Sequence, residues 1–498
     1  MAVVVSCLAD ELSALARLAR SAARDADVVE LRLDRLPKLG LDDERALAEL
    51  VATLGKPVIA ACNGPESYGH FTGTRAEQVE RLRAAARAGA SFLDVDWRVA
   101  ADLGEPAGAA RRIVSRHETS ASAFEPERWL AELASAARPG ELRKLVHASN
   151  NAEEALELLA RLAGAAGELV AFSSGSIGSF SRVVAPLLGS PFTYAAPRRG
   201  EGPPTAPGQW PVDELVDALS RLSPDGFDLF GVVGRPIEHS LSPAVHGELL
   251  RAARRNALYV AFEAHDFERF ARAARACGVR GLSITAPFKQ DAVRLADEAD
   301  PSARELGAAN TWLATAHGWR ASNTDIAGVH ALFERAEGLL GRPLDGLELC
   351  VLGAGGAARA LAAVARERGL RVVFAVRAPA RAESLAARFG AEVVEWDALA
   401  TRRTDVLVNA TPVGWKRGES PLPAAWLRAT LVVDSIYRTP ESELLRTARE
   451  RGLLTLGGET WFLAQAAEQA RTFSGIEPDR LALLRSFRAA IGSIPTPE

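Results

Sequence analysis

The stretch Leu347-Glu-Leu-Cys-Val-Leu352, followed by Gly353-Ala354-Gly355-Gly356-Ala357-Ala358, decides the fold of the second half of this 498-residue chain. Its first six residues form an apolar run typical of a buried strand, and residues 359–368 have a helical composition. A strand that enters a helix through a G-x-G-x-x-G/A turn lets backbone N–H groups and a helix N-terminus approach a pyrophosphate, because glycine has no side chain. The stretch predicts a dinucleotide-binding α/β unit whose cofactor contacts are Gly353, Ala354, Gly355, Gly356 and Ala357.

The next strand-like run, residues 371–376, ends at Arg377. An enzyme that uses NAD usually carries an acid at this point for the ribose hydroxyls, whereas arginine favours a 2′-phosphate. Arg381 adds a second guanidinium four residues later. The pair predicts NADP as the cofactor.

Two motifs upstream of this unit predict a substrate pocket. Ser240-Leu-Ser242-Pro243 holds two hydroxyls in a turn, where they suit a carboxylate. In Thr285-Ala-Pro-Phe-Lys289, the proline releases a lysine from a strand-like run, so the lysine can exchange a proton with a reacting oxygen. A helix that begins near Lys289 would disfavour its charged form through the helix dipole and so help proton exchange.

The first 220 residues alternate eight apolar runs with segments of helical period. The runs cover residues 3–6, 28–33, 57–61, 92–95, 112–115, 145–148, 169–172 and 192–195. This alternation predicts a (β/α)8 barrel. An open doubly wound sheet is an alternative that the pattern leaves open.

Length and composition predict about three α/β domains. A linker at residues 223–226 suggests a barrel over 1–222, a substrate domain over 227–328 completed by 461–498, and a nucleotide-binding domain over 329–460. The net charge of −4 gives no basic footprint for nucleic acid, and no apolar stretch approaches the ~18 residues of a membrane span. The four scattered cysteines have no metal-ligand spacing, so we expect no metal, and the N-terminus lacks a signal-peptide pattern, so we expect a cytoplasmic protein.

The ordered motifs of the second half resemble shikimate dehydrogenase. Further matching stretches are 309–311, 322–325 and 457–465. The resemblance implies that Lys289 exchanges a proton with the reacting oxygen and that Asp325 orients it. The substrate contacts that it implies are Ser240, Ser242, Thr285, Asn310, Tyr437 and Gln465, and the further cofactor contacts are Thr411 and Gly458. Ser283 and Trp461 depart from the family, in which Asn and Met are common.

The first half contains Ser6, the stretch 30–34, the stretch 115–117, Lys144, the pair 181–182 and the stretch 205–209. With these residues it resembles type I 3-dehydroquinate dehydratase along essentially its full length. Lys144 begins the apolar run 145–148, so a barrel would hold its amine among packed side chains, where desolvation favours the neutral, nucleophilic form. The resemblance implies that Lys144 forms a Schiff base with a ketone and that His117 moves the protons. The implied substrate contacts are Ser6, Glu30, Arg32, Arg182, Thr205 and Gln209. Asn63 and Ser67 depart from the family, which usually has an arginine and a glutamate there, and Glu66 is a candidate to replace that glutamate.

Both resemblances together imply a fused enzyme of the shikimate pathway. It would dehydrate 3-dehydroquinate to 3-dehydroshikimate and then reduce this product to shikimate with NADPH, so its partners would be these small molecules. Two alternatives stay open: the barrel is a non-catalytic binding or scaffolding module, or the second half oxidises quinate with NAD.

Overall fold

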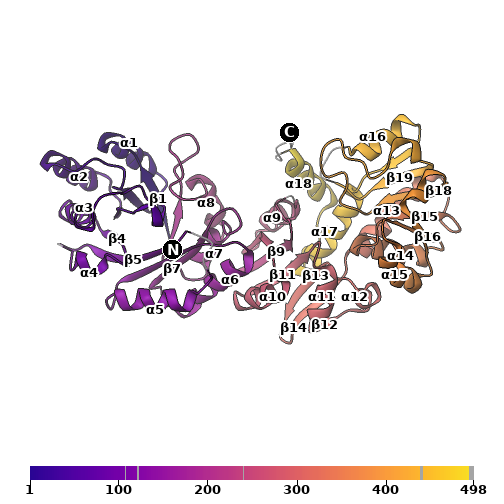
Figure 1. Ribbon diagram of the computed structural model, residues 1–498, viewed down its shortest axis with the longest axis horizontal. Coiled ribbons are helices and arrows are strands. Elements are labelled where there is room, and N and C mark those ends of the chain that lie inside the picture. Colours follow the sequence, from indigo (N-terminus) through magenta and orange to yellow (C-terminus); the bar gives the residue numbers. More distant parts are fainter. Residues whose placement is uncertain (107, 120–122, 166, 239, 438–440, 493–498) are drawn as a thin grey trace. The chain divides into compact units, whose positions relative to one another are not determined.

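The computed structural model describes residues 1–106, 108–119, 123–165, 167–238, 240–437 and 441–492 (Figure 1). By their internal contacts these residues form two compact units. The first contains Met1–Asp228 and Phe262–Gly278, and the second contains Leu229–Ala261 and Val279–Glu498. Within the described ranges, no helix is both long enough and apolar enough to cross a membrane.

Eight parallel strands form the sheet of the first unit. They are β1 (Ala2–Leu8), β2 (Val28–Arg32), β3 (Val58–Ala61), β4 (Phe92–Asp96), β5 (Arg111–Glu118), β6 (Leu142–Ala148), β7 (Leu169–Ser174) and β8 (Phe192–Ala195). Each coincides with one of the predicted apolar runs. The order is β7-β6-β5-β4-β3-β2-β1-β8, so sequence neighbours are also spatial neighbours and β8 returns to pair with β1. A doubly wound sheet reverses direction from a central strand, and this order does not, so the predicted barrel is confirmed.

Helices follow the barrel strands in sequence and cover them (Figure 1). They are α1 (Leu12–Ala22), α2 (Leu41–Thr53), α3 (Arg75–Arg87), α4 (Ala100–Leu103), α5 (Pro126–Ala136), α6 (Ala152–Ala160), α7 (Ser181–Leu187) and α8 (Val212–Ser220). Helix α3 shows why these segments are helical. The Thr74 hydroxyl caps it by accepting from the Glu77 N–H, and the Glu77 carboxylate accepts in turn from the Thr74 N–H. Val79 and Leu82 are buried one turn apart.

The second unit contains a mixed six-stranded sheet. Its strands are β9 (Asp228–Gly234), β10 (Ala257–Glu263), β11 (Val279–Ile284), β12 (Glu298–Ala299), β13 (Thr311–Thr315) and β14 (Gly318–Ser322), in the order β10-β9-β11-β13-β14-β12. The connecting helices of this unit are α9 (Ser242–Ala252), α11 (Lys289–Leu295) and α12 (Pro301–Leu306), whereas α10 (Phe267–Ala276), between β10 and β11 in sequence, belongs to the first unit. The predicted Ser240-Ser242 motif therefore leads into α9, and Lys289 begins α11.

A second, wholly parallel sheet follows α13 (Asp325–Leu340). Its strands are β15 (Glu348–Leu352), β16 (Arg371–Val376), β17 (Glu392–Glu395), β18 (Thr404–Asn409), β19 (Ala429–Asp434) and β20 (Leu454–Leu456). The order β17-β16-β15-β18-β19-β20 is that of a Rossmann fold, with the topological switch point between β15 and β18. The predicted Gly-rich turn lies at this point and leads into α14 (Gly356–Glu367), and α15 (Glu383–Phe389) and α16 (Glu443–Glu450) complete the unit.

The last two helices, α17 (Glu459–Ser474) and α18 (Arg480–Gly492), pack back onto earlier elements. Helix α17 contacts α13, β11 and β13, and α18 contacts α9. Phe462 of α17 and Phe487 of α18 belong to one buried cluster with Leu241 and Val245. The three domain ranges stay a prediction, and the final predicted segment includes residues 493–498, which lie outside the described ranges.

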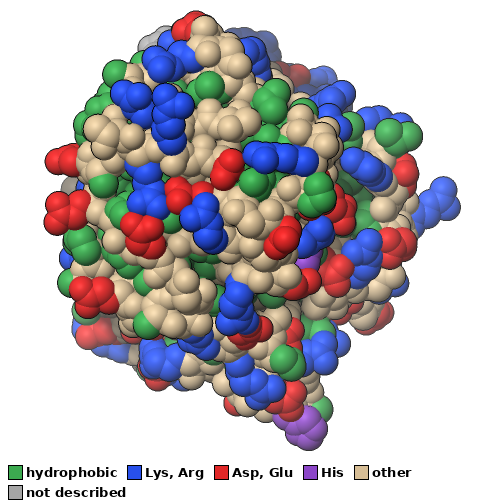
Figure 2. Space-filling model, turned by 90° about the vertical axis from the view of Figure 1, so that its right-hand side faces the viewer, with side chains coloured by type: hydrophobic (Ala, Val, Ile, Leu, Met, Phe, Trp, Pro, Cys, Tyr) green, Lys and Arg blue, Asp and Glu red, His purple; other side chains and the backbone are tan. Residues whose placement is uncertain are grey.

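Acidic and basic side chains interleave on the face of the molecule that Figure 2 shows. This mixture agrees with the nearly balanced counts of 59 Lys and Arg against 63 Asp and Glu.

Candidate active sites

The residues predicted for the dehydratase site line one pocket inside the barrel. Of the predicted set, Ser6 alone does not line it. The lining residues are Glu30, Arg32, Asn63, Ser67, Tyr68, His117, Lys144, Val146, Phe172, Arg182, Tyr194, Thr205, Ala206 and Gln209. Most lie at or just after the carboxyl ends of strands, where barrel enzymes place their active sites.

Lys144 belongs to a layer of four side chains that come from alternate strands. Its Nζ lies 2.7 Å from Asp94 Oδ2, 3.9 Å from Glu30 Oε1 and 3.9 Å from the centroid of the Tyr194 ring. These residues lie on β6, β4, β2 and β8, and layers built from alternate strands are a general property of eight-stranded barrels. The Lys144 side chain is 5% exposed, so its amine is desolvated as predicted, but it also has a buried carboxylate partner.

Asp94 was not predicted. Burial raises the pKa of Asp94, but the positive charges of Lys144 and His117 and hydrogen bonds from Lys144 and Ser115 outweigh it and lower the pKa below its ordinary value. Asp94 is therefore a carboxylate that can accept the proton of Lys144 or stabilise its cation.

His117 is half-buried in this pocket, and its imidazole is neutral. Burial, together with the positive charge of Lys144, lowers the pKa of His117 to about 3. Its Nδ1 atom is buried and has no hydrogen-bond partner among the described residues. A neutral ring with an unpartnered nitrogen can accept a proton from a bound substrate.

Arg182 has the properties of a carboxylate receptor. It is 1% exposed, and burial lowers its pKa to about 10. Its guanidinium donates only to main-chain oxygens, at 3.2 Å to Tyr194 and 3.4 Å to Pro207, and Nε has no partner in the described parts of the chain. A buried guanidinium without a counter-ion is costly, so the pocket is electrostatically ready for an anion.

Other predicted contacts are already engaged with one another. Ser6 Oγ donates to Glu30, and Arg32 forms two bonds to Asp34, at 2.8 and 3.1 Å, and one to the Tyr68 carbonyl. This arrangement holds Glu30 toward Lys144, while Arg32 still lines the pocket.

Thr205 and Gln209 shape the loop between β8 and α8. Gln209 Oε1 accepts from the N–H groups of Thr205 and Ala206, at 2.7 and 3.2 Å, so the amide folds the loop over the pocket. Gly208 has a φ of +75°, and a Cβ there would lie 2.2 Å from the Gly175 carbonyl oxygen, so this close approach requires glycine.

The two departures from the family both line the pocket. Asn63 is buried with Oδ1 unpartnered within the described ranges, and Ser67 Oγ donates to Asp96 at 3.1 Å. Glu66, the predicted replacement for the family glutamate, is 53% exposed and pairs with Arg98 instead of with His117. Asp94 and Asp96 are therefore the carboxylates whose charge acts on His117.

The dehydrogenase pair comes together as the resemblance implies. Lys289 Nζ lies 2.5 Å from Asp325 Oδ2, and the two side chains are 18% and 7% exposed. Lys289 begins α11 and Asp325 begins α13, where the Asp325 N–H donates to Asn323 Oδ1 at 3.0 Å. This bond fixes the turn before α13, so the Asp325 carboxylate is held within hydrogen-bonding distance of the Lys289 amine.

Asn310 connects the surrounding loops. Its Oδ1 accepts from the Thr324 N–H at 2.8 Å, and its Nδ2 donates to Thr324 Oγ1 at 3.0 Å and to Gln465 at 3.5 Å. Gln469, one turn after Gln465 on α17, was not predicted. It is 1% exposed and donates to the Asn310 carbonyl and to Thr311 Oγ1, each at 3.0 Å.

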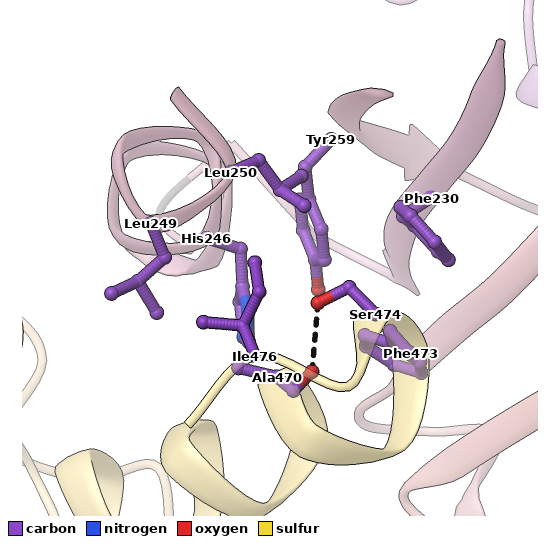
Figure 3. Close-up of a pocket in the computed structure, with 9 residues that line it drawn as sticks. All are labelled: Phe230, His246, Leu249, Leu250, Tyr259, Ala470, Phe473, Ser474 and Ile476. Atoms are coloured by element: carbon purple, nitrogen blue, oxygen red, sulfur yellow. Dashed lines mark hydrogen bonds between the residues drawn. The ribbon is translucent and has the colours of Figure 1, made fainter. Parts of the chain in front are cut away.

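Several hydrogen-bonded polar side chains are buried next to this site, beside β10 and β11. Tyr259 donates to Ser283 at 2.5 Å, and Ser283 donates to Gln469 at 2.8 Å. Tyr259 lies against the His246 ring of α9 with centroids 4.6 Å apart, beside Phe473 and Ser474 (Figure 3). Ser283 stands where asparagine is common in the family, and its hydroxyl has the Gln469 amide oxygen as a hydrogen-bond acceptor.

The remaining predicted substrate contacts lie around this network. Ser242 is buried at the start of α9, and its N–H donates to Ser240 Oγ at 3.3 Å. Thr285 follows β11 and packs against Gly234, where a Cβ would approach its methyl to 2.4 Å. Tyr437 stacks on Phe462 with centroids 4.4 Å apart. Their roles in substrate binding stay predictions.

The Gly-rich turn fits a dinucleotide. Gly353 has a φ of +96°, and a Cβ there would touch Thr411 at 3.1 Å. Helix α14 has no side-chain cap at Gly355, so its first N–H groups remain available to a phosphate. A Cβ on Gly356 would lie 2.7 Å from Lys289 Cδ, which places the turn directly beside Lys289 and its partner Asp325.

The strand end after β16 fits a 2′-phosphate. Arg377 and Arg381 are exposed, and the Arg377 guanidinium lies 5.5 Å from the centroid of the Trp396 ring. Gly458 packs closely against the main chain, because a Cβ there would lie 2.4 Å from the Ser435 carbonyl oxygen, and its contact with the cofactor stays a prediction.

Family models of known proteins match both halves of the chain, as the two resemblances predict. The family model described as type I 3-dehydroquinase matches residues 3–225, the shikimate dehydrogenase substrate binding domain matches 232–312, and the NADP oxidoreductase, coenzyme F420-dependent, matches 348–434. Within the residues described, no group of three or more His, Cys, Asp and Glu side chains could hold a metal ion.

Three relatives illustrate the range of similarity. The bifunctional 3-dehydroquinate dehydratase/shikimate dehydrogenase, chloroplastic, of Arabidopsis thaliana is 29% identical over 91% of this chain and 78% of its own. The shikimate dehydrogenase (NADP(+)) of Pyrococcus abyssi is 34% identical over 50% of this chain and 94% of its own. The crystal structure of shikimate dehydrogenase from Aquifex aeolicus is 32% identical, covers 53% of this chain and 98% of its own, and gives a TM-score of 0.49. The chain belongs to the shikimate dehydrogenase family, with a type I 3-dehydroquinase domain fused ahead of the dehydrogenase.

Proposed function

We propose that the protein catalyses two consecutive steps of the shikimate pathway, dehydration of 3-dehydroquinate and NADPH-dependent reduction of the resulting 3-dehydroshikimate. The observation that carries the first step is the buried Lys144 amine in a pocket that also contains Arg182 without a counter-ion. The second step rests on the Lys289–Asp325 pair beside the Gly356 turn.

In the barrel, Arg182 would receive the substrate carboxylate while Lys144 attacks the ketone carbon. A C–N bond forms, and the ketone oxygen leaves as water to give an imine. His117 would then take a proton from the carbon between the imine and the carboxylate-bearing carbon, whose hydroxyl leaves as a second water. Hydrolysis of the imine returns Lys144 and releases the conjugated ketone.

Lys144 has to lose a proton before it attacks. Asp94 lies 2.7 Å away, and His117 is neutral and has an unpartnered nitrogen. Once Lys144 is neutral, one of the effects that lower the His117 pKa is gone, so the histidine becomes a better base when the reaction needs one.

In the dehydrogenase, Lys289 would donate a proton to the carbonyl oxygen as it becomes a hydroxyl, and Asp325 would orient the amine. NADPH, when bound, supplies the hydride. Gly353, Gly355 and Gly356 would hold the pyrophosphate, and Arg377 with Arg381 the 2′-phosphate.

The test is to add 3-dehydroquinate and NADPH to the purified chain and to measure shikimate. Without NADPH, the reaction should stop at the conjugated ketone, which is followed by its absorbance. A flat absorbance would show that the barrel is a non-catalytic module, and quinate oxidation with NAD in preference to shikimate with NADP would show the other alternative. The expected cytoplasmic location stays a prediction, while the name of the Arabidopsis relative places that protein in the chloroplast.

A further inference from the structure

Tyr194 is the one member of the Lys144 layer whose polar group has no assigned use. The other three, Glu30, Asp94 and Lys144, interact with one another or with Ser6. Tyr194 lies on β8 and is 2% exposed, and its hydroxyl is buried without a hydrogen-bond partner among the described residues. A buried hydroxyl without a partner is costly in a folded protein, so its persistence calls for an explanation.

The position of Tyr194 points to the substrate. Its ring lies under the Lys144 amine, 3.9 Å from the centroid, and its main-chain oxygen accepts from Arg182 Nη1 at 3.2 Å. Tyr194 therefore contacts both groups that would hold the two ends of a keto acid, and it lines the pocket between them. The shorter path round the ring between the two anchors is the carbon that loses the proton, and the longer path carries the ring hydroxyl groups.

We propose that the Tyr194 hydroxyl is a further substrate-binding and catalytic group of the barrel, which forms a hydrogen bond with a ring hydroxyl of the bound cyclic keto acid. This inference rests on the proposed dehydratase function. Burial, with the nearby charges of Glu30 and Asp94, raises the pKa of Tyr194 well above its ordinary value, so the phenol stays neutral and can both donate and accept. A neutral partner also suits a pocket in which Asn63 and Ser67 replace the charged residues common in the family.

The experiment compares wild type with Tyr194→Phe in the full-length chain. The phenylalanine keeps the ring under Lys144 and removes only the hydroxyl. We expect kcat/KM for 3-dehydroquinate to fall about tenfold to a hundredfold, as for the loss of one buried hydrogen bond in the bound state. Borohydride added during turnover should still fix the substrate on Lys144, and shikimate oxidation should be unchanged because Tyr194 lies in the other unit.

Thermal unfolding separates a substrate contact from a structural one. Removing an unpartnered hydroxyl should leave the unfolding midpoint unchanged or raise it. Tyr259→Phe is the matched control, because it removes a buried hydroxyl that donates to Ser283 at 2.5 Å and should lower the midpoint. A wild-type kcat/KM in Tyr194→Phe, or a fall of its midpoint like that of the control, would overturn the inference alone. Absence of turnover in the wild type would overturn the proposed function and the inference with it.

Discussion

The two lysines that we predict to be catalytic have the same kind of partner in different surroundings. Lys144 lies 2.7 Å from Asp94 with both side chains almost fully buried, and Lys289 lies 2.5 Å from Asp325 with 18% of the lysine exposed. Around Lys144, atoms of Asn63, His117, Arg182 and Tyr194 have no partner among the described residues. Around Lys289, the polar groups of Asn310, Thr324 and Gln469 are bonded to one another.

The difference matches the two kinds of chemistry. A lysine that attacks a ketone must become neutral and needs a desolvated pocket that the substrate completes. A lysine that donates a proton to an oxygen must stay supplied with protons and needs access to solvent and a fixed direction, which Asp325 provides. The barrel pocket therefore has polar atoms without a hydrogen-bond partner, to which a substrate could bond. In the dehydrogenase site, the polar groups are already hydrogen-bonded to one another.

The largest expected effect is in the barrel. Lys144→Ala should lower dehydration by about 10⁴-fold or more, because no other group can form the imine. Since the alanine leaves Asp94 buried and unpaired, Lys144→Arg is the second variant: it keeps the positive charge and cannot form an imine. Both should lose the borohydride-fixed adduct on the residue-144 peptide and keep shikimate oxidation, while Lys38→Ala on the barrel surface should behave as wild type. An adduct on another lysine in these variants would refute the assignment.

The corresponding change in the dehydrogenase should be somewhat smaller. Lys289→Ala or Asp325→Asn should lower shikimate oxidation by about 10²-fold to 10⁴-fold, the usual contribution of a positioned general acid or base. Dehydration, measured on the same preparation, should be unaffected and serves as the control for folding. Near wild-type turnover of shikimate in Lys289→Ala would show that the pair is misassigned.

A third effect concerns the cofactor alone. Arg377→Ala should lower kcat/KM with NADPH by about tenfold to a hundredfold and leave NADH nearly unchanged, because only the 2′-phosphate contact is lost. Arg381→Ala should act in the same direction. Measuring both cofactors with each variant checks this, and an unchanged preference in both variants would remove the arginines from the site.

The barrel and the Rossmann sheet were predictable because their strands are apolar runs at regular spacing. The Lys144 layer shows what was missed and why. Asp94 and Tyr194 each interrupt such a run, on β4 and β8, as Glu30 does on β2. Polar residues at matching points of alternate barrel strands face one layer, and this spacing was a signal that could have identified both.

Other contacts had no signal in the sequence. Gln469 looks like one more polar position on an amphipathic helix, and only the packing of α17 against β11 and β13 shows that it faces Ser283 and Asn310. Glu66 was a candidate to replace the family glutamate that is missing at Ser67, but the loop directs the Glu66 side chain to Arg98. Tertiary packing, which one sequence does not reveal, decided both cases.

The smallest expected effect is on the pH dependence of stability, and it comes from His117 instead of from Lys144 or Lys289. In the folded chain the pKa of His117 is lowered from 6.5 to about 3, chiefly by burial. As the pH falls below 6.5, the unfolded chain binds a proton at this histidine while the folded chain does not, so the unfolding free energy declines until the pH reaches about 3. His117→Gln cannot take up that proton, so its midpoint in urea should fall less steeply between pH 6.5 and 4 than that of the wild type. Equal slopes would mean that the pKa of His117 in the folded protein stays near its ordinary value, so that neither burial nor the charge of Lys144 lowers it.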